Sequence, residues 1–439
     1  MKRILLSKTP IIIILLITLL FVKLQVNKRS SQTDTCFNIC GDARGYYAWL
    51  PAIFIYHNLN FSFFDTVEMK EAYCGAQIGI PIQDYRYSLE GKSIDKYYPG
   101  VSFMMLPFFA TAHLATKFFT TYPVTGYSPL YFKIMGFSGI FYYFLGMLFF
   151  LKILELLKLN TLQKTLTVLL VTFGSNIIYY TVDAPVYSHI YSFTLIIVFL
   201  YYSFCLKNKF SVKHLAYLSF LAGWIFVARP VNISIVLFLP FLFWGNIKLM
   251  WGNFKKQPLN FVFMSPVLIM PLILSVLYKI STGHYFIYSY GKEGFDFLHP
   301  HFREFIFSYD NGLFPYMPLL LFPVLFLFMW YKRENKKIIT GLCITLAVTI
   351  YIHSSWWSWS YGFSFGARTM LDFLSLFGIM IGLSLKQVNL KRYIFLIPVY
   401  FACCGLTIIL YHQQSHGGYM HQYPISDYWE AIYNAIRIK

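Results

Sequence analysis

The amino-acid sequence predicts an all-α, polytopic membrane protein with about eleven transmembrane helices and with interfacial helices in its first extracytoplasmic loop. Of its 439 residues, 57% are hydrophobic and only 12% are charged, a balance too apolar for the surface of a soluble domain. Apolar runs of about 20 residues, the length that crosses a bilayer, recur along the chain. Short basic clusters separate alternate runs, as in cytoplasmic loops. We therefore expect one membrane domain, residues 1–439, and no soluble domain.

The crossings follow from the length of the apolar runs and from the alternation of the basic clusters. We predict them at 10–27, 130–152, 163–181, 187–206, 214–228, 231–247, 260–280, 313–331, 338–353, 369–386 and 393–411. The first run follows Lys2, Arg3 and Lys8 but lacks a small-residue cleavage site, which favours a retained helix over a signal peptide. The two short runs that flank Arg229 and Pro230 can also be interpreted as one broken hairpin.

The distribution of charge predicts the orientation. A net charge of +18 would suggest nucleic-acid binding in a soluble protein, but here the basic residues form loop clusters, so no nucleic-acid partner is predicted. The clusters are Lys152/Lys158/Lys164, Lys207/Lys209/Lys213, Lys248/Lys255/Lys256, Lys332/Arg333/Lys336/Lys337 and Lys386/Lys391/Arg392. Nearly all acidic residues lie in the other set of loops. This predicts the N-terminus inside, the tail 412–439 outside, and any carboxylate chemistry on the extracytoplasmic side.

Residues 28–129 form the one long extracytoplasmic segment before the second crossing. Within it, 97–119 is apolar enough to cross the membrane, but counting it would reverse every later loop. We therefore predict an interfacial or re-entrant helix opened by Pro99. The stretch 43–59 resembles a second interfacial helix, with Tyr and Trp side chains at the headgroup boundary. Three cysteines of this loop, Cys36, Cys40 and Cys74, allow at most one disulfide and one free thiol.

Asp42 is the first candidate for chemistry, in the stretch NICGDARGYYAWLPAIFIY (38–56). An acid before Ala43 and Arg44 suits a helix N-cap, where it meets free N–H groups and the helix dipole. The same carboxylate at a membrane face can act as a general base on an acceptor hydroxyl. The two roles are compatible.

Charged residues in the later predicted outer elements also have two readings each. Arg229 and Arg368 either snorkel to the interface or bind a phosphate with their planar guanidinium groups. Asp183 either caps the next helix or helps to hold a polar acceptor or a metal. His189 is either a satisfied interfacial histidine or a member of that site.

Aromatic residues and histidines complete the candidates. Trp356, Trp357 and Trp359 either form an interfacial aromatic belt or, beside glycines, stack on a sugar ring. His299 and His301 lack the ligand spacing of a zinc site. The sequence has no Walker-type Gly-Lys-Ser/Thr motif, so a donor should arrive already activated.

Five motifs carry a family resemblance. They are GDARGYYAWLP after the first crossing, KYYPGVSFMMLPF (96–108), TFGSNIIYYTVDAPVYSHIYSF (172–193), ARPVN, and WWSWSYGFSFGAR (356–368). Their order resembles the GT-C superfamily of integral membrane glycosyltransferases, in particular a bacterial branch related to protein mannosyltransferases and lipid A aminoarabinose transferases. The resemblance implies a polyprenyl-phosphate sugar donor and a multi-pass protein of the bacterial cytoplasmic (inner) membrane, with its active site on the extracytoplasmic side.

The resemblance also implies roles for individual residues. Asp42 takes the place of the catalytic acid of the first outer loop and would act as general base in an inverting transfer. Arg229, Arg368 and Lys96 would bind the donor phosphate.

The remaining implied roles concern the acceptor, the sugar and a metal. Asp183 takes the place of a second acid of the family, with His189 beside it. Some relatives carry an acidic pair where this chain has Ala43 and Arg44, so a divalent cation stays open as a cofactor. Sugar or lipid contacts are assigned to Arg44, Tyr46, Tyr98, Trp356, Trp357 and Trp359.

A second class of function is a lipid-linked glycan transporter, a flippase or a polymer ligase. Transporters place charges at mid-membrane and show two similar halves, whereas here the charges gather at one face and no halves are recognised. A purely structural membrane protein would not need Asp42, Arg229 and Arg368 on one side. The acceptor (lipid, glycan or protein) stays open, and membrane lipids are the remaining expected partner.

Overall fold

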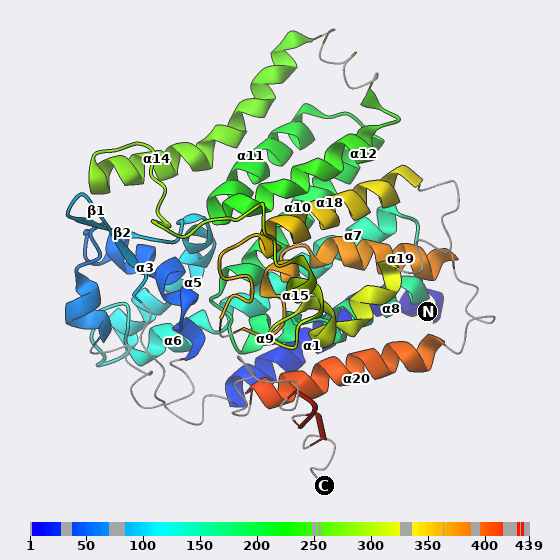
Figure 1. Ribbon diagram of the computed structural model, residues 1–439, viewed down its shortest axis with the longest axis horizontal. Coiled ribbons are helices and arrows are strands. Elements are labelled where there is room, and N and C mark those ends of the chain that lie inside the picture. The colour runs from blue at the N-terminus through cyan, green and yellow to red at the C-terminus, as the bar shows by residue number, and fades with distance from the viewer. Residues whose placement is uncertain are drawn as a thin grey trace.

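The computed structural model describes residues 2–27, 37–69, 84–247, 257–324, 336–362, 364–387, 396–415, 428–430 and 432–433, with the single positions 252 and 255. This part of the chain is mostly helical (Figure 1). Its α-helices are α1 (Lys2–Asn27), α3 (Asp42–Phe54), α5 (Gly100–Phe119), α6 (Pro129–Met135), α7 (Ser138–Leu156), α8 (Thr161–Phe173), α9 (Ile177–Val182), α10 (Ser188–Asn208), α11 (Val212–Ala228), α12 (Leu239–Phe243), α14 (Ile269–Thr282), α15 (Phe302–Phe307), α16 (Leu313–Tyr316), α18 (Lys336–Ser354), α19 (Leu374–Gln387) and α20 (Leu396–Ser415). Strands β1 (Arg86–Leu89) and β2 (Lys92–Asp95) and the short helical turns η2 (Phe37–Ile39), η3 (Phe64–Glu68), η5 (Pro230–Phe238), η6 (Pro258–Leu268), η7 (Pro318–Leu320) and η9 (Arg368–Leu371) lie between them.

The described part contains five helices that are long and apolar enough to cross a membrane. They are Lys8–Asn27, Pro129–Leu156, Ser188–Asn208, Pro258–Thr282 and Lys336–Ser354. Each coincides with a predicted crossing. The shorter apolar helices Val212–Ala228, Pro230–Phe243 and Leu374–Lys386 coincide with three more.

The predicted crossing at 163–181 is wrong as a single helix. The chain leaves α8 at Gly174 and starts α9 at Ile177. Between them, the Asn176 side chain donates to the Phe365 carbonyl (3.1 Å) and the Ser175 hydroxyl donates to Val171 (2.7 Å). These polar side chains bond to backbone carbonyls where the helix is interrupted. The length of an apolar run in the sequence does not reveal such a break.

Helix ends that carry lysine clusters lie next to one another. Lys386 Nζ donates to the Leu157 carbonyl (2.8 Å), where α7 ends. Asn246 Nδ2, just after α12, donates to the Lys207 carbonyl (2.7 Å) near the end of α10. The N-terminus, the start of α18 and the end of α19 also share the right-hand end of the bundle in Figure 1. Because α10 has Lys207 at this end, His189 in its first turn lies at the other.

Most elements of the first predicted loop gather at the left of Figure 1. The predicted helix at 97–119 is present as α5, which follows Pro99, and α3 lies within the predicted 43–59. The prediction that the Tyr and Trp side chains of α3 lie at the headgroup boundary is wrong for Tyr46 and Trp49, which are 4% and 1% exposed and pack against other parts of the protein. Apolar and aromatic composition does not distinguish burial in protein from burial at headgroups.

A β-hairpin in the same loop was not predicted. β1 and β2 pair antiparallel, with Leu89 opposite Lys92. The two residues between them, Glu90 and Gly91, have φ of 51° and 77°, as in the two-residue turns that match strand twist. The hairpin leads directly into Lys96 and the residues that precede α5.

Several predictions fall wholly or partly outside the described residues. The predicted crossing at 313–331 runs past residue 324, and α20 covers most of the predicted 393–411. Cys36 and Cys74 are not described, while Cys40 is a free thiol. In the tail, Tyr428 donates its hydroxyl to the Pro315 carbonyl (2.6 Å).

Gly100 sets the closest approach between α5 and the end of α11. A Cβ at this position would overlap the backbone nitrogen of Ala228 and lie 2.5 Å from the carbonyl carbon of Val227. We expect Gly100→Ala to lower the free energy of unfolding by about 1–3 kcal/mol, because backbone cannot move aside as a side chain can. The midpoint of thermal unfolding in detergent measures this. Gly405→Ala in α20, where a Cβ would meet nothing within 4 Å, is the control, and equal effects of the two substitutions would contradict the packing argument.

Candidate active site

Asp42 is the first residue of α3, and two donors hold its carboxylate. Oδ1 accepts from the Tyr97 hydroxyl (2.7 Å) and Oδ2 from Arg368 Nη2 (2.5 Å). The Tyr97 ring lies against Gly45, one turn along α3, where a Cβ would collide with it. The absence of a side chain at Gly45 therefore lets the Tyr97 hydroxyl reach Asp42.

The structure decides against the N-cap role of Asp42. The residue before α3 is a glycine, no side chain caps the helix, and the Asp42 oxygens bond to Tyr97 and Arg368 instead. Burial by itself would raise the pKa of Asp42. The Arg368 charge, the Tyr97 hydrogen bond and the more distant Lys96 and His189 outweigh burial, so the pKa lies below its ordinary value. Asp42 is therefore an ionised carboxylate, and its side chain is 20% exposed.

Arg368 does not snorkel. The residue is 7% exposed and starts η9, immediately before α19. Its guanidinium carbon lies 5.4 Å from the ring centroid of Tyr187 and 5.6 Å from that of Tyr361. An arginine that is buried between two rings and a carboxylate has its charge satisfied within the protein.

A second charged cluster surrounds Asp372, between η9 and α19. Its carboxylate receives His189 Nδ1 (2.8 Å) and Asn232 Nδ2 (2.8 Å), and Arg229 Nη1 lies 3.4 Å away. Arg229 Nη1 also lies 2.8 Å from His189 Nδ1. Asp372, His189 and Asn232 are 0%, 2% and 1% exposed. The cluster therefore joins the start of α10, the turn after α11 and the entrance of α19.

Asp372 was not among the predicted site residues, although a signal for it was present. It lies within the predicted crossing 369–386, and an ionisable residue inside a crossing is a functional candidate by default. Asp372 stands apart from the other acidic residues of the predicted site, which lie in the predicted outer loops.

Tyr46 and Tyr361 connect the two clusters. The Tyr46 hydroxyl lies near the Ser188 side chain and within electrostatic reach of Arg229. Tyr361 packs on Arg368 and also lies within reach of Arg229. The two arginines predicted to bind phosphate therefore face one region of the protein.

Aromatic rings extend this region toward the segment after α14. Tyr46 and Tyr97 have ring centroids 4.7 Å apart. Tyr290 lies 6.3 Å from Tyr97, 6.4 Å from Tyr98 and 5.7 Å from Trp356. Three of the predicted sugar or lipid contacts, Tyr46, Tyr98 and Trp356, are thus near Asp42 or linked to it through rings.

Lys96 lies at the edge of the same region. Its ammonium pairs with Glu293 (2.5 Å) and stands 5.6 Å and 5.5 Å from the ring centroids of Tyr97 and Tyr290. Each cation predicted to bind phosphate is therefore already paired with a carboxylate: Arg368 with Asp42, Arg229 with Asp372, and Lys96 with Glu293.

Other predicted residues lie elsewhere or face other partners. The Arg44 guanidinium pairs with Glu68 (2.7 Å) and is buried, so it contacts neither headgroups nor Asp42. Trp357 is 60% exposed, and Trp359 stacks on His301 with ring centroids 6.0 Å apart. Asp183 directly follows Val182, the last residue of α9.

The residues around Asp42 do not form a protein-only cage for a divalent cation. Among the described residues, no group of three or more His, Cys, Asp or Glu side chains converges as a metal site would require. A hard cation needs oxygen ligands, but both carboxylate oxygens of Asp42 already accept hydrogen bonds, one from the Tyr97 hydroxyl and one from the Arg368 guanidinium.

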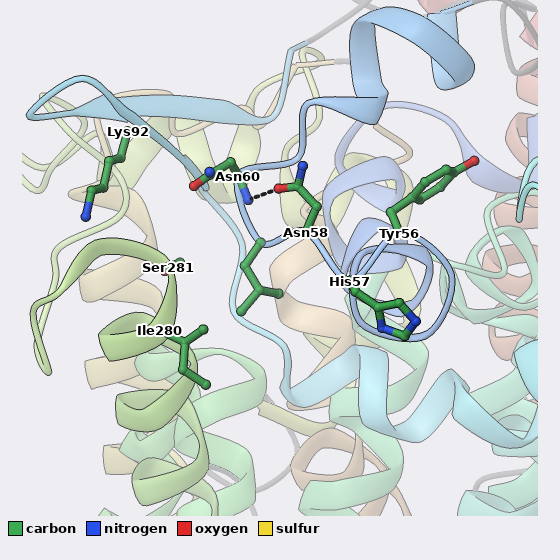
Figure 2. A pocket seen from close by; sticks show the side chains of 8 residues that line it. Tyr56, His57, Asn58, Asn60, Lys92, Ile280 and Ser281 are labelled. Atoms are coloured by element: carbon green, nitrogen blue, oxygen red, sulfur yellow. Dashed lines mark hydrogen bonds between the residues drawn. The ribbon is translucent and has the colours of Figure 1, made fainter.

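A separate cavity of about 610 Å³ opens between the loop after α3, the start of β2 and the end of α14. Figure 2 shows the lining side chains, including the Asn58 oxygen that accepts the Asn60 N–H (2.8 Å). Lys92 at its rim donates to the Thr282 carbonyl (2.9 Å). None of the lining residues belongs to the Asp42 or Asp372 clusters.

Comparison with known proteins gives no relative: no protein-family model, curated protein or solved structure matches the chain.

Proposed function

We propose that the protein is an integral membrane glycosyltransferase that moves a sugar from a polyprenyl-phosphate donor to an acceptor hydroxyl, with Asp42 as general base. One observation carries the proposal. An ionised, partly exposed carboxylate lies among cations from distant segments, at the ends of α10 and α19 opposite their lysines. A base beside phosphate-binding cations is the minimum that transfer from a phosphate-linked sugar requires.

The proposed reaction balances with groups of this chain. The acceptor O–H bond breaks and its proton passes to Asp42. The acceptor oxygen forms a bond to the anomeric carbon while the bond from that carbon to the phosphate oxygen breaks, which inverts the configuration. Negative charge grows on the leaving phosphate, where an arginine stabilises it most in the oxocarbenium-like transition state.

The membrane context belongs to the same proposal. Crossings in addition to the five long helices, about eleven in all by run length, would give a GT-C-like fold. The adjacent lysine-bearing ends would face the cytoplasm of a bacterial cell, and Asp42 would face the extracytoplasmic side of the inner membrane.

A reconstitution experiment tests the function. Purified protein in nanodiscs receives polyprenyl-phosphate sugars and envelope extracts as acceptor, and mass spectrometry detects the transferred sugar. Transfer supports the enzyme. Lipid binding and movement between leaflets without any transfer would instead support the transporter or flippase.

The pH profile should depend on Arg368. The lowered pKa of Asp42 means that the stabilisation from its ion pair is present above the ordinary value of 3.8 and is lost as pH falls through the lowered pKa. The groups that face Asp42 are Arg368, Tyr97, Lys96, His189, Tyr46 and Tyr187. In Arg368→Gln, the largest effect that lowers the pKa of Asp42 is removed, so burial raises that pKa. We expect the acidic limb of kcat/KM, recorded from about pH 4 to pH 8, to move to higher pH. An unchanged limb would contradict the assignment of Asp42 as the titrating base.

A further inference from the structure

The two arginine–aspartate pairs of the site are exposed in opposite senses. In the Arg368–Asp42 pair, the aspartate side chain is 20% exposed and the arginine side chain 9%. In the Arg229–Asp372 pair, the arginine side chain is 16% exposed and the aspartate is fully buried. In each pair, therefore, one charged group is partly exposed and the other is more deeply buried: Asp42 is the more exposed member of the first pair and Arg229 of the second.

Asp372, the buried aspartate, is held by hydrogen bonds on both of its oxygens. Asp372 binds His189 and Asn232 at 2.8 Å each, so its two oxygens are fixed by α10 and η5. Arg229 Nη1 lies 2.8 Å from His189 Nδ1 and 3.4 Å from Nε2, so the guanidinium lies against the imidazole ring that Asp372 holds. Asp372 and His189 thus both set the position of the Arg229 guanidinium.

Arg229 can move toward a ligand while both oxygens of Asp372 keep a hydrogen-bond donor, His189 on Oδ1 and Asn232 on Oδ2. Its distance to Asp372, 3.4 Å, is longer than the 2.5 Å between Arg368 and Asp42, and Asp372 keeps two other donors. If Arg368 turned to a phosphate, Asp42 would keep the hydrogen bond from the Tyr97 hydroxyl to Oδ1, but Oδ2 would lose its donor.

We infer that the four charged residues divide into contact and positioning roles: Arg229 contacts the donor phosphate and Asp372 positions it, while Asp42 contacts the acceptor and Arg368 positions it. The inference rests on the proposed function and deepens it. It narrows the prediction that Arg229, Arg368 and Lys96 all bind the donor phosphate.

The test separates lipid binding from turnover. Polyprenyl phosphate without a sugar is titrated into nanodisc protein, and its Kd is measured beside kcat and KM for the sugar donor. We expect Arg229→Gln to raise the Kd about 10- to 100-fold, the effect of losing charged hydrogen bonds. Asp372→Asn should raise it about 3- to 10-fold, with a matching rise in donor KM. Arg368→Gln should leave the Kd within about twofold and lower kcat.

Two further variants control for effects on folding. Arg86→Gln removes an arginine that also pairs with carboxylates, Asp65 and Asp84, outside the site, and should change neither Kd nor kcat. If Asp372→Asn does not fold, Asn232→Ala removes one donor from Asp372 without changing charge and should raise the Kd in the same direction.

Failure of the division of roles can be distinguished from failure of the proposed function. A larger rise in Kd for Arg368→Gln than for Arg229→Gln would overturn the division of roles but would leave the proposed glycosyltransferase function intact. Wild-type protein that neither binds polyprenyl phosphate nor transfers a sugar would overturn the proposed function itself.

Discussion

Asp42→Asn is expected to abolish sugar transfer while the protein still binds polyprenyl phosphate. The amide keeps the size of the side chain and can still accept from Tyr97, but it cannot take the acceptor proton. Loss of a positioned general base lowers kcat by about 10²- to 10⁴-fold. Because His189 and Asp372 still lie against Arg229, and Asn232 still holds Asp372, the Kd for the lipid should change little.

The measurement is single-turnover transfer from a labelled donor, recorded beside the lipid Kd. Asp296→Asn is the matched control, because Asp296 is 60% exposed and bonds to His299 within its own loop. Full activity of Asp42→Asn would remove Asp42 from the mechanism. Loss of both transfer and lipid binding would mean that the ion pair with Arg368 supports the binding site rather than the chemical step.

Run length and charge alternation predicted much of the helical architecture, because both reflect local sequence. They failed where the outcome depended on distant contacts. The carboxylate of Asp42 meets Arg368 across 326 positions, and no local pattern specifies that pair. The two residues were nevertheless predicted on one face, because topology assigns loops to sides of a membrane without any contact information.

The remaining errors have one physical cause. An apolar residue looks the same in sequence whether lipid or protein surrounds it, so α3 was predicted at an interface although Ala43 to Ala52 are buried in protein. Asp372 was missed for the converse reason: its polar partners, His189 and Asn232, come from other segments. A carboxylate in an apolar run has to be satisfied from elsewhere in the fold, and that need is itself a predictive signal.

Glu68→Ala is expected to cause the largest loss of stability among single substitutions in the first loop. Glu68 is fully buried, and its Oε1 accepts from Arg44 Nε (2.7 Å). Its Oε2 accepts from the hydroxyls of Tyr85 (2.8 Å) and Tyr127 (3.0 Å). Removing the carboxylate leaves a buried guanidinium and two buried hydroxyls without this acceptor. Breaking a buried pair from one side costs about 3–5 kcal/mol.

Thermal unfolding of detergent-purified variants measures this loss, and the exposed pair Asp65–Arg86 provides the comparison. Asp65 is 62% exposed, so Asp65→Ala should cost about 0–1 kcal/mol. Equal destabilisation by the two substitutions would show that the buried pair does not hold the loop. Arg44 is two residues from Asp42 on α3, but Glu68 itself bonds to Arg44, Tyr85 and Tyr127 and to no residue of the Asp42 or Asp372 clusters. Transfer activity of Glu68→Ala should therefore fall in proportion to the fraction of folded protein, whereas Asp42→Asn should remain folded and inactive.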